Sequence, residues 1–208
     1  MMPVLPFIVR RNTMQKDSVF QDFTAPAKFF HWLMAAIIIV AWFVGFYGAE
    51  MLSYSVPHSG KAEMITLHKN ISTTVLLLIV LRSAWRLTHR PPHAPHTSAF
   101  QNFAVQAGHF MLYFLMIAMP LSGWANSSSA GYAVEFAGII PLPALVPTNP
   151  AIQPIYDAIH QYLGWFTGVM ILGHIVMALK HHFIDRDHTL RGMLPGRKRV
   201  NRARGMVR

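Results

Sequence analysis

The chain has 208 residues, of which 53% are hydrophobic and only 12% charged, a balance typical of membrane proteins rather than of soluble domains. It contains no cysteine, which excludes disulfides, covalently attached c-type haem and cysteine-ligated iron–sulfur clusters. The net charge of +10 is gathered beside apolar segments, so it does not indicate a nucleic-acid partner.

The N-terminal region, residues 1–25, precedes the first long apolar stretch. Its apolar run, residues 4–9, is too short for the core of a signal peptide, and no small-residue cleavage site follows it. We therefore expect a cytoplasmic N-terminal region. Met14 is an alternative start of the chain.

Four apolar stretches are each long enough to cross a bilayer, which requires about 20 residues in a helix. We place them at residues 27–49, 64–87, 103–124 and 155–183. Pro26 suits the first turn of a helix, where its missing N–H costs nothing. The sequence thus predicts an all-α membrane protein, a four-transmembrane-helix bundle over residues 26–183.

The connections between these stretches differ in character. Residues 88–100 form a proline-rich loop that carries His89, His93 and His96. Residues 125–154 form a longer, proline-rich loop without lysine or arginine, which we expect to cap the bundle with a short helix over residues 133–139. Residues 184–208 are a basic cytoplasmic tail that can lie on anionic lipid.

Lysine and arginine near the segment ends predict the orientation, because they favour the cytoplasmic side. On one side of the bundle the basic residues are Lys61 and Lys69. All others lie in the N-terminal region, in residues 82–90 or in the tail that starts at Lys180, apart from Lys28 at the start of the first segment. Both termini are therefore expected in the cytoplasm.

The last apolar stretch presents two histidines on one helix face. His160 and His174 are about 21 Å apart along the axis and about 40° apart around it. Gly164 and Gly168 lie between them on nearly the same face. Two stacked flat cofactors would need this pattern, but the glycines also match a small-residue helix-packing motif, and single membrane histidines often hydrogen-bond across a bundle.

The predicted topology sorts the histidines into two levels. His68 and His160 lie at the outer level; His31 and His174 lie at the inner level, with His109 as a competitor. Two histidines at each of two levels suit two bis-imidazole haems, whereas a closed zinc site would need four ligands in one small volume. Fourteen residues after His68, Arg82 could reach anionic groups at the inner side. Snorkelling to the membrane surface is the alternative for Arg82 and Arg86.

Several motifs occur in a fixed order along the chain: Ala27–Leu33 around His31, Leu67–Lys69, Leu81–Arg86, Gly108–Tyr113, Met119–Gly123, and the final run of His160, Leu163–Gly164, Gly173–His174, His181–Phe183 and Asp187–Pro195. With these motifs, residues 22–196 resemble the prokaryotic cytochrome b561 family. The resemblance implies a dihaem b-type cytochrome of the bacterial inner membrane, with His31 paired with His174 and His68 paired with His160.

The resemblance also implies a reaction. Members of this family pass electrons between the outer face and membrane quinone, and some are similar to superoxide oxidases, which oxidise superoxide and reduce ubiquinone. The chain is therefore expected to be an oxidoreductase with two haem b groups and ubiquinone as the electron acceptor. A haem-bearing anchor subunit for a partner dehydrogenase or hydrogenase is the main alternative, and a non-redox bundle or metal carrier is the third.

The remaining site predictions concern the two substrates. His181, seven residues after His174, and His109 are expected to bind quinone and supply a proton at the inner side; ordinary interfacial positions are the alternative for His181 and His182. Lys69 and Lys61 are expected to steer superoxide, since more distant carboxylates are screened. Expected partners are membrane lipid, quinone and superoxide, with a homodimer as an open alternative and no nucleic acid.

Overall fold

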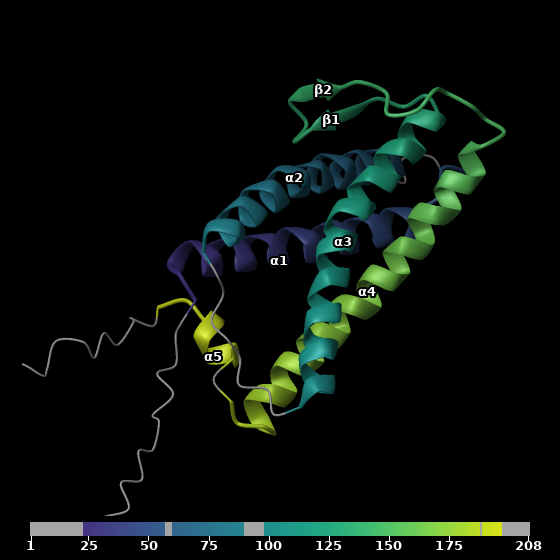
Figure 1. Cartoon of the computed structure of the whole chain (residues 1–208). Coiled ribbons are helices and arrows are strands. Elements are labelled where there is room, and N and C mark those ends of the chain that lie inside the picture. Colours follow the sequence, from purple (N-terminus) through teal and green to yellow (C-terminus); the bar gives the residue numbers. More distant parts are fainter. Residues whose placement is uncertain (1–22, 57–59, 90–97, 188, 197–208) are drawn as a thin grey trace, which may run out of the picture.

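The computed structural model describes residues 23–56, 60–89, 98–187 and 189–196 (Figure 1). The expectations for Met14, His93 and His96, and for most of the N-terminal region and the end of the basic tail, concern residues outside these ranges.

Four long helices make up the fold. These are α1 (Ala25–Phe46), which continues as the π-helical turn η1 (Tyr47–Met51), α2 (Lys61–Thr88), α3 (Ala99–Ser129) and α4 (Gln153–Phe183). A short helix, α5 (Thr189–Met193), follows α4. All four long helices are long and apolar enough to cross a membrane, which confirms the predicted all-α membrane bundle. The helices are longer than the predicted apolar stretches, because the backbone hydrogen bonds of each helix continue into the polar residues at its ends.

Among the four long helices, a side chain caps only the start of α3. Thr24 is the N-cap of α1 and Pro26 lies in its first turn, as predicted. The hydroxyl of Ser98 accepts a hydrogen bond from the Gln101 backbone N–H (3.2 Å) and so caps α3. Gly60 precedes α2 with a φ of 73°, a conformation that glycine adopts without strain.

The long connection between α3 and α4 contains a β-hairpin, so the predicted short helix over residues 133–139 is wrong. Strands β1 (Val134–Phe136) and β2 (Ile140–Leu142) pair antiparallel, with Glu135 opposite Pro141. The turn needs positive φ at Ala137 (54°) and Gly138 (71°), which a right-handed helix cannot supply. The hairpin lies on α2, where the Ala137 N–H donates to the Thr73 hydroxyl (3.0 Å).

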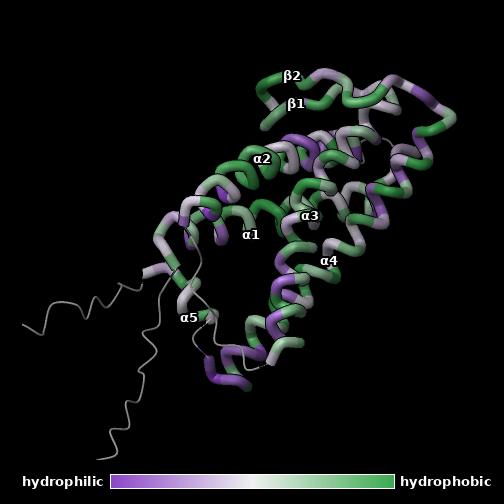
Figure 2. Tube along the Cα trace, in the orientation of Figure 1, coloured by the Kyte–Doolittle hydropathy of each residue, from purple (hydrophilic) through white to green (hydrophobic). Residues whose placement is uncertain are grey.

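The helices pack as two pairs, α1 along α2 and α3 along α4, with a smaller contact between α2 and α3. The buried core is small and centres on Met34, Val75 and Ile79. Few apolar side chains of the described residues are fully buried and many large ones are exposed, and Figure 2 shows hydrophobic residues along all four long helices. This distribution is what lipid, rather than water, requires of a surface.

The segment after α4 returns to the start of α1. In Figure 1 the two helix pairs diverge toward the end where α5 lies. The Lys28 ammonium donates to the Leu194 carbonyl (3.2 Å), and the Trp32 indole N–H donates to the Met193 carbonyl (2.9 Å). These two contacts hold the α5 segment against the start of α1.

Candidate functional site

One histidine pair, called outer after the predicted orientation, joins α2 to α4, and the other is called inner. The ring centroids of His68 and His160 are 6.1 Å apart, with 67° between the ring planes. The Nδ1 atom of His68 lies 2.8 Å from the Ala41 carbonyl, which can only accept, so Nδ1 carries the proton. The Ser122 hydroxyl donates to the Met119 carbonyl (2.9 Å) and therefore accepts from His160 Nδ1 (2.9 Å). In both neutral rings the lone pair is consequently on Nε2.

Two glycines make room for these rings. A Cβ atom on Gly45 of α1 would lie 2.6 Å from His68 Nδ1, and one on Gly123 of α3 would lie 2.8 Å from His160 Cε1. Both distances are shorter than packed atoms allow, so any larger residue would displace the imidazole. The helices that flank the outer pair are therefore shaped to hold it.

The inner group contains three histidines rather than two. His31 of α1 and His174 of α4 have ring centroids 6.2 Å apart, at an interplanar angle of 62°. The ring centroid of His109 of α3 is also close to that of His174, at 5.8 Å, with 71° between the ring planes. His109 donates Nδ1–H to the Val105 carbonyl (2.8 Å). The distances alone do not choose between His31 and His109 as the partner of His174.

Both pairs have the dimensions of a bis-imidazole metal site. Imidazole nitrogens bind metals at about 2.0–2.1 Å, so a metal between two rings places their centroids about 6 Å apart. The pairs at 6.1 and 6.2 Å satisfy this, and the outer pair also has its Nδ1 atoms engaged by acceptors, which is the usual support of a metal-binding histidine. These residues fit a haem iron between each pair.

Arg82 lies beside the inner pair. Its Nη2 atom is 3.3 Å from His31 Nδ1, and its Nε–H donates to the Tyr113 hydroxyl (3.1 Å). The Arg86 guanidinium donates to the same hydroxyl (3.3 Å). Arg82 and Arg86 thus turn inward to a shared phenol in α3 rather than only outward to the membrane surface, and they add positive charge to the inner site.

The space between the two levels is crossed by Trp42. Its indole N–H donates to the Gly164 carbonyl (2.8 Å), and a Cβ atom on Gly168 would lie 2.9 Å from its Cζ2 atom. The two glycines therefore receive a tryptophan from α1. Thr167, on the same side of α4, is buried, and its hydroxyl has no hydrogen-bond partner among the described residues.

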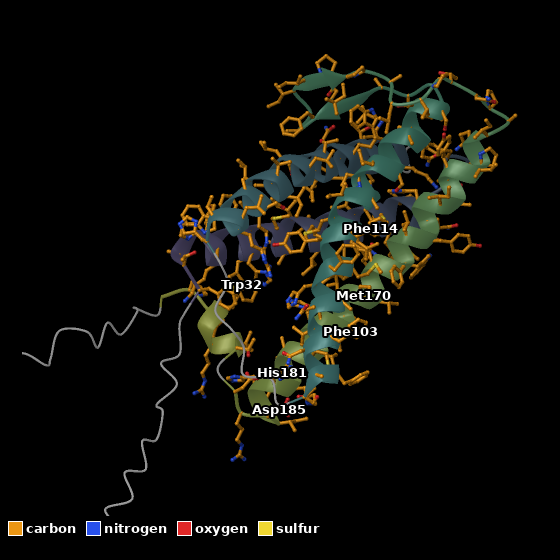
Figure 3. All side chains as sticks on the ribbon, in the orientation of Figure 1. Trp32, Phe103, Phe114, Met170, His181 and Asp185 are labelled. Carbon is orange, nitrogen blue, oxygen red and sulfur yellow. The ribbon has the colours of Figure 1, made fainter. Side chains whose placement is uncertain are left out.

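His181 is held in the connection between α4 and α5. Its Nδ1 atom is 2.9 Å from an Asp185 carboxylate oxygen and 3.1 Å from one of Asp187. Lys180 hydrogen-bonds Asp185 (2.7 Å) and thereby keeps the pKa of that exposed carboxyl below its ordinary value. Figure 3 shows His181 and Asp185 at this end of α4, with Trp32 on the α1 side. His181 is thus grouped with carboxylates, whereas His109 is grouped with His174.

The other predicted residues have structural contacts. Lys69 donates to the Ala133 carbonyl (3.0 Å) in the outer connection, and Lys61 donates to the carbonyls of Ala49 and Leu52 (both 3.1 Å). Carbonyl acceptors do not neutralise an ammonium group, but the Glu135 carboxylate interacts electrostatically with Lys69 and offsets part of its positive charge. The ring of His89 stacks on that of Trp85 at 3.8 Å, away from both histidine pairs.

Sequence reasoning missed several residues that support the histidines. Ser122, Gly123 and Tyr113 belong to the motifs Met119–Gly123 and Gly108–Tyr113, but nothing in their spacing shows which residues they contact. The Ala41 carbonyl and Trp42 belong to none of the motifs. Their roles depend on which helices become neighbours.

Comparison with known proteins agrees with this geometry. The model of a family described as prokaryotic cytochrome b561 matches residues 22–196. The chain is 34% identical over 166 residues to cytochrome b561 homolog 2 of Escherichia coli (strain K12), covering 79% of this chain and 87% of that protein. It is 27% identical over 182 residues to cytochrome b561 homolog 1 of the same organism (85% and 98%). It is 28% identical over 169 residues to the probable superoxide oxidase CybB of Yersinia pestis (81% and 93%).

Proposed function

The chain belongs to the prokaryotic cytochrome b561 family, and from this premise we propose that it carries two b haems and transfers electrons from superoxide at the outer face to ubiquinone at the inner side. Family membership itself implies b-type haem, redox chemistry and a multi-pass place in the inner membrane. The number of haems, the two substrates and the roles of individual residues are the proposal.

One observation carries it: two imidazole pairs, at 6.1 and 6.2 Å, are held about 21 Å apart along α4. His68 and His160 would hold the outer haem, and His31 and His174 the inner one. When bound, the haems supply one-electron transfer. The chain contributes outer imidazoles with fixed tautomers, a bundle that excludes water, and Arg82 as a cation beside the inner site.

Positive charge would bring the donor to the outer site. Because both imidazoles of the outer pair would bind the haem iron, superoxide could not bind the iron itself. The local electric field alone would position it. Lys69 adjoins His68 in sequence, and Lys61 lies two turns before it. Glu135 lies close enough to Lys69 to offset part of this field, whereas exposed carboxylates beyond about 8–10 Å are screened at physiological salt.

Protons and electrons balance at the inner side. Two superoxide ions each lose one electron and become dioxygen; one ubiquinone takes up these two electrons and two protons and becomes ubiquinol. His181, held by Asp185 and Asp187, would hydrogen-bond a quinone oxygen and deliver a proton, and His109, which packs against His174, would contact the quinone from the side of the inner histidines. With both termini in the cytoplasm, these protons come from the cytoplasmic side.

Stopped-flow mixing of the purified protein with superoxide, with and without ubiquinone, tests the proposal. We expect fast haem reduction by superoxide, followed by reoxidation only when ubiquinone is present. The rate should fall with rising salt and in Lys69→Glu, whereas Lys69→Gln, which can still donate to the Ala133 carbonyl, should show an intermediate rate. Absence of haem reduction by superoxide would reject this reaction and favour an anchor subunit that relays electrons from a partner enzyme.

A further inference from the structure

We propose that Trp42 is a positioning residue that fixes the separation of α1 from α4, and with it the geometry of both histidine pairs. The inference rests on the proposed function for its consequence in electron transfer. Its structural part, that Trp42 sets the distance between the two helices, is independent of that function.

The contact joins helices that otherwise belong to different pairs. α1 packs along α2 and α4 along α3, and the two pairs diverge toward α5 (Figure 1). Trp42 lies in the last turns of α1, away from α5, and bridges the two pairs there, because its indole N–H donates to the Gly164 carbonyl at 2.8 Å. Its ring lies against the Gly168 backbone so closely that an added Cβ would meet three of its atoms, at 2.9 to 3.2 Å.

Aromatic neighbours hold the indole in this place. The Trp42 and Phe46 rings are parallel, with centroids 5.5 Å apart. Trp165 of α4 packs edge-on against both, at 6.1 Å from Trp42 and 5.5 Å from Phe46. The indole therefore cannot turn away from Gly168 without breaking contacts on both helices, and it acts as a rigid spacer.

The spacer lies between the two levels. Gly164 and Gly168 are about 6 and 12 Å from His160 along α4, and His174 is about 21 Å from it. On α1, Trp42 follows Ala41, whose carbonyl accepts from His68. The indole thus occupies the layer between the outer pair and the inner pair.

Helices α1 and α4 together position all four proposed haem ligands. α4 carries His160 and His174; α1 carries His31 and the carbonyl that orients His68. A shift of α1 against α4 would consequently change both ring-to-ring distances at once. Trp42 would itself be neither oxidised nor reduced: one electron leaves the outer site and one arrives at the inner site, and the indole only holds these sites in place.

Two substitutions on opposite helices test the spacer. Gly168→Ala adds a methyl group that must push the indole away, and Trp42→Leu removes the indole. Gly164→Ala is the matched control on the same helix, because its Cβ would be at an ordinary 3.7 Å from the Met119 methyl group. The double variant Trp42→Leu/Gly168→Ala has room for the added methyl group, so it should behave like Trp42→Leu alone.

The helix separation is measured first. The chain contains no cysteine, so spin labels can be attached to single cysteines at Val40 of α1 and Val169 of α4, both exposed. We expect Gly168→Ala to lengthen the label-to-label distance and Trp42→Leu to shorten it, each by about 1–2 Å, the size of a helix shift. Unchanged distances in both variants would overturn the inference, whether or not the protein holds haem.

The second readout is spectroscopic and kinetic. In Gly168→Ala the low-spin electron paramagnetic resonance signals of both haems should shift together, and electron transfer between the sites should slow by about ten- to a hundredfold, the cost of misplacing reacting groups by about 1 Å. Gly164→Ala should leave both unchanged. A shift of one signal only, or an unchanged rate with changed helix distance, would overturn the role in electron transfer. Absence of haem from the purified wild-type protein would instead reject the proposed function.

Discussion

The guanidinium of Arg82 lies 3.3 Å from Nδ1 of His31, and in this contact it can only donate. The ring nitrogen must then supply its lone pair, which leaves the proton of a neutral imidazole on Nε2. A haem iron bound through Nε2 needs the opposite tautomer, with the proton on Nδ1. If His31 holds the inner haem as proposed, Arg82 would have to turn from His31 toward another acceptor, and a haem carboxylate would be the acceptor that the cofactor itself supplies.

Arg82→Gln should accordingly lower the midpoint potential of the inner haem. The variant removes a positive charge that favours the electron-rich state, and we expect a decrease on the order of 60 mV, equivalent to a tenfold change in a one-electron equilibrium. Redox titration of the purified protein measures it. Arg82→Lys, which keeps the charge, should retain most of the wild-type potential. Equal potentials in wild type and Arg82→Gln would show that the guanidinium lies elsewhere in the loaded protein.

Gly45→Ala should impair the outer haem selectively. The added Cβ would lie 2.6 Å from His68 Nδ1 and so would break its contact with the Ala41 carbonyl. Loss of such a supporting contact typically costs about 10–100-fold in metal affinity. Haem content per chain should fall toward one. Gly108→Ala is the control, because its Cβ would meet nothing within 4 Å; equal haem content in both variants would contradict the proposed outer site.

His181→Ala should keep both haems but slow quinone reduction. His181 lies in the connection to α5, bonded to Asp185 and Asp187, and not in either imidazole pair. A positioned proton donor contributes about 10²–10⁴-fold to a rate, so we expect a loss of at least a hundredfold in ubiquinol formation, with haem reduction by superoxide unaffected. Asp187→Asn should show a smaller loss. Normal ubiquinol formation in His181→Ala would assign the proton to another group.

Both termini should face the cytoplasm. The basis is the charge distribution: residues 125–154 contain no lysine or arginine, whereas the tail is strongly basic. A reporter enzyme that is active only in the periplasm should therefore be inactive when fused after Arg208, and one active only in the cytoplasm should work there. The reverse result would invert the bundle and exchange the donor and quinone sides.

The amount of structure that the sequence predicts differs between the helices and the site. Four membrane helices follow from hydropathy, because each stretch has to bury its own backbone polar groups in lipid. The facing of His160 and His174 follows from the helix period alone. The hairpin over Val134–Leu142 was missed because its strands have three residues each and depend on contacts with α2.

The contacts that support the histidines could not be predicted from the sequence, for a different reason. Ser122 accepts from His160, and Trp42 lies on Gly168, only because α3 and α1 come to lie beside α4. Such contacts depend on tertiary packing, which one sequence does not specify residue by residue. The same holds for His109: its spacing could not choose between His31 and His109 as the partner of His174, and both lie within 6.2 Å of it.

The most direct test of the account is the number of b haems per chain in the purified protein and in four alanine variants. Wild type should carry two. His68→Ala and His160→Ala should each lose the same haem, identified by its spectrum and potential, and His31→Ala and His174→Ala should each lose the other. Two haems retained in His174→Ala would contradict the account, and loss of the inner haem in His109→Ala with retention in His31→Ala would assign the inner pair to His109 and His174.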